Sequence, residues 1–125
     1  MSIFKTAIVG IGLLGKQHAK TVSSCDKLEL TAICDLYESQ MSSTKAEYPS
    51  VKTFTDYNVM FGACDIDLAI IATQDPYHKE PILSACKHGV KYIICEKPFA
   101  IFNDIAIPKI KLLNVIFLMF ISILF

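Results

Sequence analysis

Three short clusters in the sequence contain residue types that could do chemistry. The first is the glycine-rich segment Gly10-Ile11-Gly12-Leu13-Leu14-Gly15, which follows an apolar run and precedes a stretch with helical spacing. Glycines in this pattern allow a tight turn, a close approach of the main chain to a pyrophosphate, and close packing of the following helix. The free N–H groups at the start of that helix would face the phosphate charge.

An acidic residue, Asp35, follows 20 residues after Gly15, where the next apolar run ends. A carboxylate at this position could accept hydrogen bonds from a ribose diol, and it would repel a 2′-phosphate. The following residues, 36–38, contain no arginine that could hold such a phosphate. The sequence therefore favours NAD over NADP as the cofactor, and a glycine-rich turn that binds nothing is the alternative.

Two further polar clusters follow later apolar runs, namely Thr73, Asp75 and His78 after the fourth run, and Glu96, Lys97 and Pro98 after the fifth. Ligands of parallel sheets bind beyond the carboxyl ends of the strands, so both clusters would border the cofactor. A lysine there could donate to a substrate oxygen and stabilise negative charge on it. Taken singly, His78 could equally be a helix cap, and Lys97 could be a surface lysine paired with Glu96.

These clusters require a scaffold of alternating strands and helices. Apolar runs predict strands over residues 3–9, 28–34, 51–54, 67–73 and 91–95. Helical spacing and end signals predict helices over residues 13–24, 37–47, 56–62 and 78–88, with Asp56 as a cap and Gly89 as a stop. This alternation predicts an α/β fold with a doubly wound, mostly parallel sheet and helices on both faces, which is the Rossmann architecture.

The composition excludes several classes of protein. The chain has 125 residues, 12 basic and 12 acidic side chains, and 53% hydrophobic residues. Balanced charge gives no field to attract nucleic acid or a membrane surface, and so apolar a chain can bury enough surface to fold.

The five cysteines contain no CxxC pair and are predicted to be reduced. With no secretory signal in residues 1–5, we expect a cytoplasmic protein, and no metal site is predicted.

Five motifs occur in an order and at spacings that resemble the Gfo/Idh/MocA family. They are the glycine motif, Cys34-Asp35, the IAT segment with a histidine five residues after Thr73, the helix end at 85–89 and the CEKP segment. That family includes glucose–fructose oxidoreductase and inositol dehydrogenase, and the resemblance covers residues 3 to about 100. It implies an NAD(P)-dependent oxidoreductase that moves hydride between nicotinamide and a sugar, inositol or related polyol. Gln74 departs from the family's usual proline, which implies a local change in the loop.

The resemblance also implies roles for particular residues. Lys97 would be the catalytic lysine. The cofactor would be held by Gly10, Ile11, Gly12, Leu14, Gly15, Asp35, Thr73, Asp75, His78, Glu96, Lys97 and Pro98.

The composition changes after about residue 100, which divides the chain into an expected dinucleotide-binding domain, 1–100, and an apolar tail, 101–125. Residues 112–125 would reach about 21 Å as a helix, short of the roughly 30 Å hydrocarbon core, so a membrane span is not favoured. The tail could be the product of a frameshift or early termination, a helix that packs on the sheet edge or on a partner, or a tail anchor. Self-association through it is a further alternative.

The family's substrate domain, with its acid–base groups, has no counterpart in this sequence. We therefore expect incomplete catalytic competence of this chain alone. The alternatives to an oxidoreductase are a dinucleotide-binding module and a truncated fragment without turnover.

Overall fold

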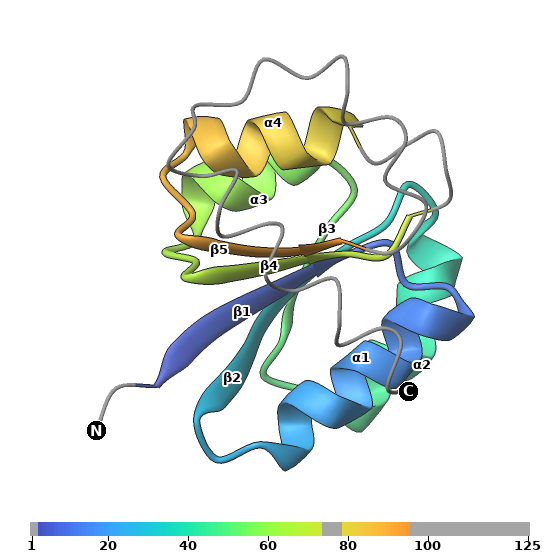
Figure 1. The fold of residues 1–125 in the computed structure, drawn as a ribbon. Coiled ribbons are helices and arrows are strands. Elements are labelled where there is room, and N and C mark those ends of the chain that lie inside the picture. Colours follow the sequence, from blue (N-terminus) through green and yellow to red (C-terminus); the bar gives the residue numbers. More distant parts are fainter. Residues whose placement is uncertain (1–2, 74–78, 96–125) are drawn as a thin grey trace.

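A computed structural model describes residues 3–73 and 79–95 of the protein. Strands and helices alternate along this part of the chain (Figure 1). The elements are β1 (Phe4–Val9), α1 (Leu13–Ser24), β2 (Leu28–Cys34), α2 (Glu38–Glu47), β3 (Lys52–Phe54), α3 (Tyr57–Ala63), β4 (Leu68–Ile71), α4 (Lys79–Lys87) and β5 (Tyr92–Cys95).

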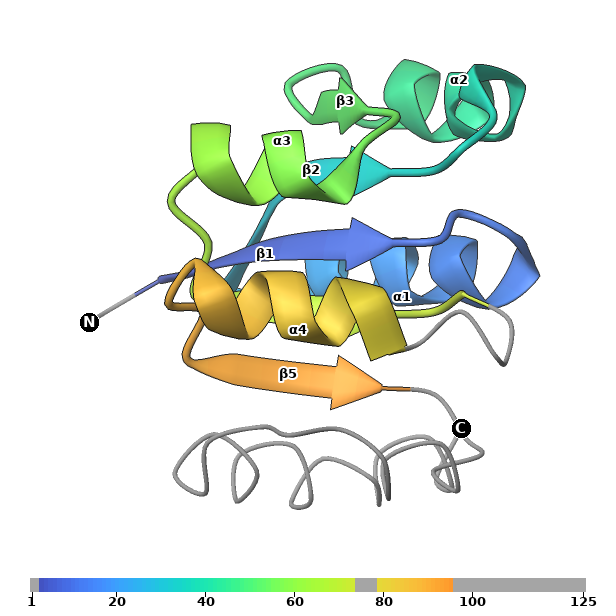
Figure 2. The same ribbon diagram turned by 90° about the horizontal axis from the view of Figure 1, so that it is seen from above.

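The strands form one parallel sheet in the order β3-β2-β1-β4-β5. Helices α1 and α2 lie on one face, and α3 and α4 lie on the other (Figures 1 and 2). The predicted α/β fold with a doubly wound parallel sheet is therefore confirmed. The chain first builds outward from β1 to β3 and then returns to add β4 on the other side of β1. This reversal beside β1 is where doubly wound sheets bind their ligands.

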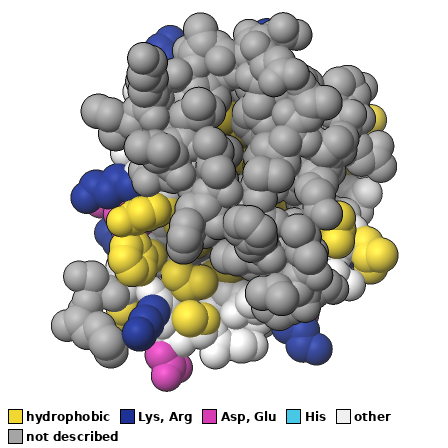
Figure 3. All heavy atoms as spheres, viewed as in Figure 1, with side chains coloured by type: hydrophobic (Ala, Val, Ile, Leu, Met, Phe, Trp, Pro, Cys, Tyr) yellow, Lys and Arg dark blue, Asp and Glu magenta, His cyan; other side chains and the backbone are white. Residues whose placement is uncertain are grey.

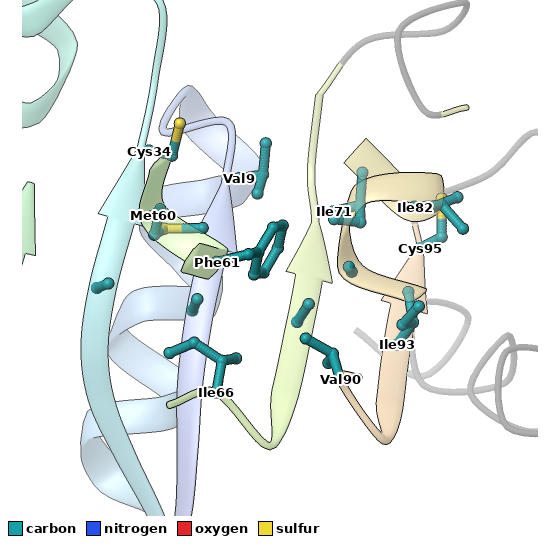
Figure 4. Close-up of a cluster of buried hydrophobic side chains, with 14 residues drawn as sticks. Val9, Cys34, Met60, Phe61, Ile66, Ile71, Ile82, Val90, Ile93 and Cys95 are labelled. Atoms are coloured by element: carbon teal, nitrogen blue, oxygen red, sulfur yellow. The ribbon is translucent and has the colours of Figure 1, made fainter. Parts of the chain in front are cut away.

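Two apolar clusters hold the helices on the sheet because successive side chains of a strand point to opposite faces. Ala7 and Val9 of β1 pack under α3 and α4, while Ile8 packs under α1. Figure 4 shows Phe61 of α3 over the face of the sheet where β1 and β4 are neighbours. Both faces of a buried parallel strand need apolar residues, which explains why all of β4 is buried.

Hydrogen bonds and backbone conformation mark the observed ends of several elements. Helix α1 and strand β2 occupy the predicted residues, whereas β4 is shorter than the predicted 67–73. The Asp67 side chain accepts a hydrogen bond from the Lys5 N–H at 2.9 Å just before the strand begins. Asp56 caps α3 as predicted, since its carboxylate accepts the Asn58 N–H at 2.8 Å. Gly89, with a φ of +82°, follows the end of α4.

On the face shown in Figure 3, the coloured lysines are spread around the rim rather than gathered in one patch. Within residues 3–73 and 79–95, no helix has the length and apolar character needed to cross a membrane. The same residues contain no cluster of three potential metal ligands among His, Cys, Asp and Glu.

Candidate functional site

The glycine-rich loop leaves the carboxyl end of β1 and is held by both neighbouring strands. The Gly10 N–H donates to the Cys34 carbonyl at 2.8 Å, and the Ala72 N–H donates to the Val9 carbonyl at 2.8 Å. Gly10 has a φ of +94°, and a Cβ there would lie 2.8 Å from the Thr73 nitrogen. The turn therefore requires glycine at position 10, for its backbone conformation and for space.

Gly15 is required for a different close contact. A Cβ at this position would lie only 1.9 Å from the carbonyl oxygen of Gly10. The first turn of α1 thus lies directly against the loop that precedes it. The close packing predicted for this third glycine is present, and its partner is the loop backbone at the end of β1.

Gly12 differs from the other two glycines of the motif. Its φ is −84°, and a Cβ built there would have no heavy atom of residues 3–73 and 79–95 within 4 Å. Gly12 is the N-cap residue of α1, where no side chain caps the helix and no acidic residue occupies the first turn. The N–H groups of a helix start need acceptors, and phosphate oxygens are suitable ones. The open space at Gly12 therefore fits the approach of a phosphate group.

The Asp35 carboxylate lies beside this loop and already has protein partners on both oxygens. Its Oδ2 accepts the Ile11 N–H at 2.9 Å, and its Oδ1 accepts the Tyr37 N–H at 3.0 Å. Carboxylate oxygens can each accept more than one hydrogen bond, so capacity for a ribose hydroxyl is left. Neither contact is among the predictions from the sequence. An aspartate before a helix start commonly accepts the N–H two residues on, so the bond to Tyr37 had a sequence signal.

Two other residues assigned to the cofactor differ in exposure. The Ile11 side chain is fully buried in the core under α1, and its N–H is taken by Asp35. Leu14 has 47% of its surface exposed at the start of α1. Leu36 and Tyr37, which directly follow Asp35, are also exposed. Ile11 is thus committed to the protein interior, while Leu14 faces outward.

The thiol nearest to the loop is inert. Cys34 is buried at the end of β2, and this burial, together with the negative charges of Asp35 and Asp56, raises its pKa to about 12. A thiol with so high a pKa is not a nucleophile at neutral pH. No disulfide bond joins any of the five cysteines in the structure.

The structure brings together part of the predicted constellation. Thr73 lies against Gly10, and Asp35 contacts the segment between Gly10 and Gly12. The remaining predicted site residues lie outside the described residues, namely Asp75, His78, Glu96, Lys97 and Pro98.

Solved structures and curated proteins resemble this chain over the same region. A scyllo-inositol dehydrogenase from Lactobacillus casei, solved with bound NAD(H) and scyllo-inositol, is 30% identical with a TM-score of 0.72, over 78% of this chain and 28% of its own. A myo-inositol 2-dehydrogenase from Lactobacillus plantarum is 33% identical with a TM-score of 0.71, over 78% of this chain and 29% of its own.

Among curated proteins, an inositol 2-dehydrogenase from Salmonella typhimurium is 31% identical over 78% of this chain and 29% of its own length. An uncharacterised oxidoreductase from Streptococcus pneumoniae is 32% identical over 78% of this chain and 25% of its own length. The chain thus spans between a quarter and a third of the length of these relatives.

Residues 4–107 match the Gfo/Idh/MocA oxidoreductase family, described by its NAD-binding Rossmann fold. This match includes the glycine loop with the open space at Gly12, Asp35 beside the loop, and all five strands of the parallel sheet. The chain therefore belongs to the Gfo/Idh/MocA oxidoreductase family and contains its NAD-binding Rossmann fold.

Proposed function

We propose that this chain binds NAD(H) at the carboxyl edge of its sheet, with the pyrophosphate over Gly12 and the adenosine ribose on Asp35. The observation that carries the proposal is the open space at Gly12, in front of a helix start without a side-chain cap. A dinucleotide pyrophosphate would supply the acceptors that the first N–H groups of α1 need. Ile11 then supports the loop from within the core, and Leu14 borders the ligand.

Asp35 also supports a preference for NAD over NADP. Its carboxylate can accept the ribose hydroxyls, whereas a 2′-phosphate at the same place would meet like charge. Residues 36–38 bring no positive side chain to offset that repulsion. NADPH should therefore bind more weakly than NADH.

We further propose that the whole protein is an oxidoreductase acting on a CH–OH group of a sugar, inositol or related polyol. NAD supplies the hydride acceptor at its nicotinamide. Lys97 would donate a hydrogen bond to the carbinol oxygen, while Thr73, Asp75 and His78 would border the nicotinamide, with Glu96 and Pro98 flanking the lysine. The names of the inositol dehydrogenase relatives support this substrate class.

Oxidation of an alcohol also needs a group that accepts the hydroxyl proton. We assign none among the described residues. A dinucleotide-binding module without turnover is therefore the second candidate. Incubating the protein with NAD and myo-inositol separates the two candidates, because NADH production requires turnover. If turnover occurs, Lys97→Ala should abolish it while leaving the Kd for NADH nearly unchanged.

The binding proposal is tested by titrating NADH and NADPH into the wild-type protein and two glycine variants. Gly12→Ala places a methyl group in the open space, whereas Gly62→Ala in α3 adds one that would lie 3.8 Å from His88 Nε2, an ordinary contact. We expect the first variant to weaken NADH binding by about tenfold or more, because the pyrophosphate must approach the backbone closely. The second should bind as the wild type does. Equal affinity of both variants would contradict the proposed position of the pyrophosphate.

We also place the protein in the cytoplasm, where its five cysteines would stay reduced. Self-association is a further proposal, and it is tested by measuring the molar mass in solution with and without NADH. A single mass of 13.9 kDa under both conditions would contradict self-association.

A further inference from the structure

One hydrogen bond of Asp35 is not explained by ribose binding. The Oδ2 atom accepts the backbone N–H of Ile11 at 2.9 Å, across 24 residues of sequence. Ile11 lies between Gly10 and Gly12, so this bond reaches into the middle of the phosphate-binding turn. A carboxylate whose only purpose was to meet a ribose would not need to hold this turn.

The turn has a physical need for such a tether. Glycine loses more conformational freedom on folding than any other residue, and two glycines flank Ile11. A hydrogen bond from a backbone N–H to an ionised carboxylate is stronger than one between neutral groups. The buried Ile11 side chain anchors the same residue from the other side, in the core under α1. Carboxylate and core together fix the one residue of the turn that has a side chain.

We propose that Asp35 is a positioning residue for the glycine loop, which sets the loop in its phosphate-receiving geometry before any cofactor binds. The Tyr37 N–H holds the second carboxylate oxygen at 3.0 Å and so restricts rotation of the carboxylate. This role rests on the proposed function, since it concerns the same loop. It is separable from ribose recognition, because it acts on the pyrophosphate part of the site.

Inorganic pyrophosphate separates the two roles because it carries no ribose. Removing Asp35 removes a negative charge, so a carboxylate that only binds ribose would leave pyrophosphate affinity unchanged or make it tighter. A carboxylate that positions the loop would make it weaker. We expect Asp35→Ala to raise the Kd for pyrophosphate by about tenfold, in line with the loss of one hydrogen bond to a charged group. The shift of the Gly12 amide resonance during titration measures this Kd.

Hydrogen exchange of the Ile11 amide in the ligand-free protein gives an independent readout. We expect exchange about tenfold or more faster in Asp35→Ala than in the wild type, because local opening of the loop no longer breaks this bond. Asp35→Asn retains one oxygen acceptor and should lie between the two in both measurements. The asparagine variant also serves if the alanine variant does not fold, as judged from the amides of the sheet.

A matched control exists at the opposite edge of the sheet. The Asp67 carboxylate accepts the Lys5 N–H at 2.9 Å, the same distance as in the bond to Ile11. Asp67→Asn should leave pyrophosphate and NADH affinities unchanged. Unchanged or tighter pyrophosphate binding by Asp35→Ala, or unchanged Ile11 exchange, would overturn the positioning role. If the wild type bound neither NADH nor pyrophosphate, the proposed function would fail and this role with it, whereas weaker NADH binding alone would leave only ribose recognition.

Discussion

The two ends of β1 use the same kind of bond for different purposes. At the amino end, the Asp67 carboxylate holds the Lys5 N–H, and further backbone bonds join Asp67 to Lys5 and Tyr92 to Asp67. At the carboxyl end, the Asp35 carboxylate holds the Ile11 N–H, but the chain then opens at Gly12. At the amino end, these bonds satisfy backbone groups of Lys5 and Asp67 within the protein. At the carboxyl end, the first N–H groups of α1 have no side-chain cap and remain able to bind a ligand.

This difference shows how a fold can be stable and still present a binding site. At the carboxyl edge, α1 begins without a side chain that caps the helix. Helix α3, on the other face, begins with a side-chain cap from Asp56. A cap at α1 would have stabilised the helix start, but it would also have occupied the N–H groups that a phosphate would use.

The largest effect is expected from a substitution at Gly15, at the carboxyl end of β1. Gly15→Ala should lower the free energy of unfolding by about 3 kcal/mol, because the new Cβ would lie 1.9 Å from the Gly10 carbonyl oxygen. Gly89→Ala is the matched control, since its Cβ would enter open space and only the φ of +82° is unfavourable. That control should cost about 1 to 2 kcal/mol. Denaturant unfolding measures both, and a smaller effect at Gly15 would refute the close contact of α1 with the loop.

Removing the bond at the amino end should affect stability without affecting the ligand. Asp67→Ala should lower the free energy of unfolding by about 2 kcal/mol, as expected for the loss of a hydrogen bond to a charged acceptor. The Kd for NADH should stay within about twofold of the wild-type value. Chemical denaturation and NADH titration of the same sample test the two statements. A large loss of NADH affinity would mean that the two edges are not independent.

Reaction with a thiol reagent tests the burial of Cys34, which lies at the end of β2. At pH 8, exposed Cys25 should react readily, whereas Cys34 beside the loop should stay unmodified in the folded protein. The folded pKa of Cys34, about 12, lies above its unfolded value of 9.0, so its contribution to stability is complete below pH 9 and is lost as the pH rises toward 12. Mass spectrometry of the modified protein identifies the reacting residue. Rapid modification of Cys34 at pH 8 would contradict its burial.

The sequence predicted the fold well because its signals were local. Apolar runs ended by Gly10 and Asp35 define strands that need burial on both faces, and Asp56 and Gly89 are standard helix-end residues. The strand β4 was predicted too long because the predicted range included the polar residues Asp67 and Thr73, which directly flank the apolar run. The lateral bonds that set its real limits come from Lys5 and Val9, far away in sequence.

The candidate site could be predicted only in outline. The glycine spacing indicated the pyrophosphate loop, but it could not separate Gly12, which faces open space, from Gly10 and Gly15, which the fold itself requires. Nor could it show that Asp35 holds Ile11, because that contact depends on how β1 and β2 lie side by side. The sequence shows which residue types are present, but the hydrogen-bond partners of Asp35 and Ile11 depend on contacts between segments far apart in the chain.

The most direct test of the account is a map of amide resonances during an NADH titration of the wild-type protein. We predict the largest changes at residues 10–15 and at Asp35, with no change beyond the noise at Lys5 and Asp67. Changes centred on the amino edge, or saturating NADH binding that left the amides of Gly12 and Leu13 unmoved, would contradict the claim that the open carboxyl edge binds the dinucleotide.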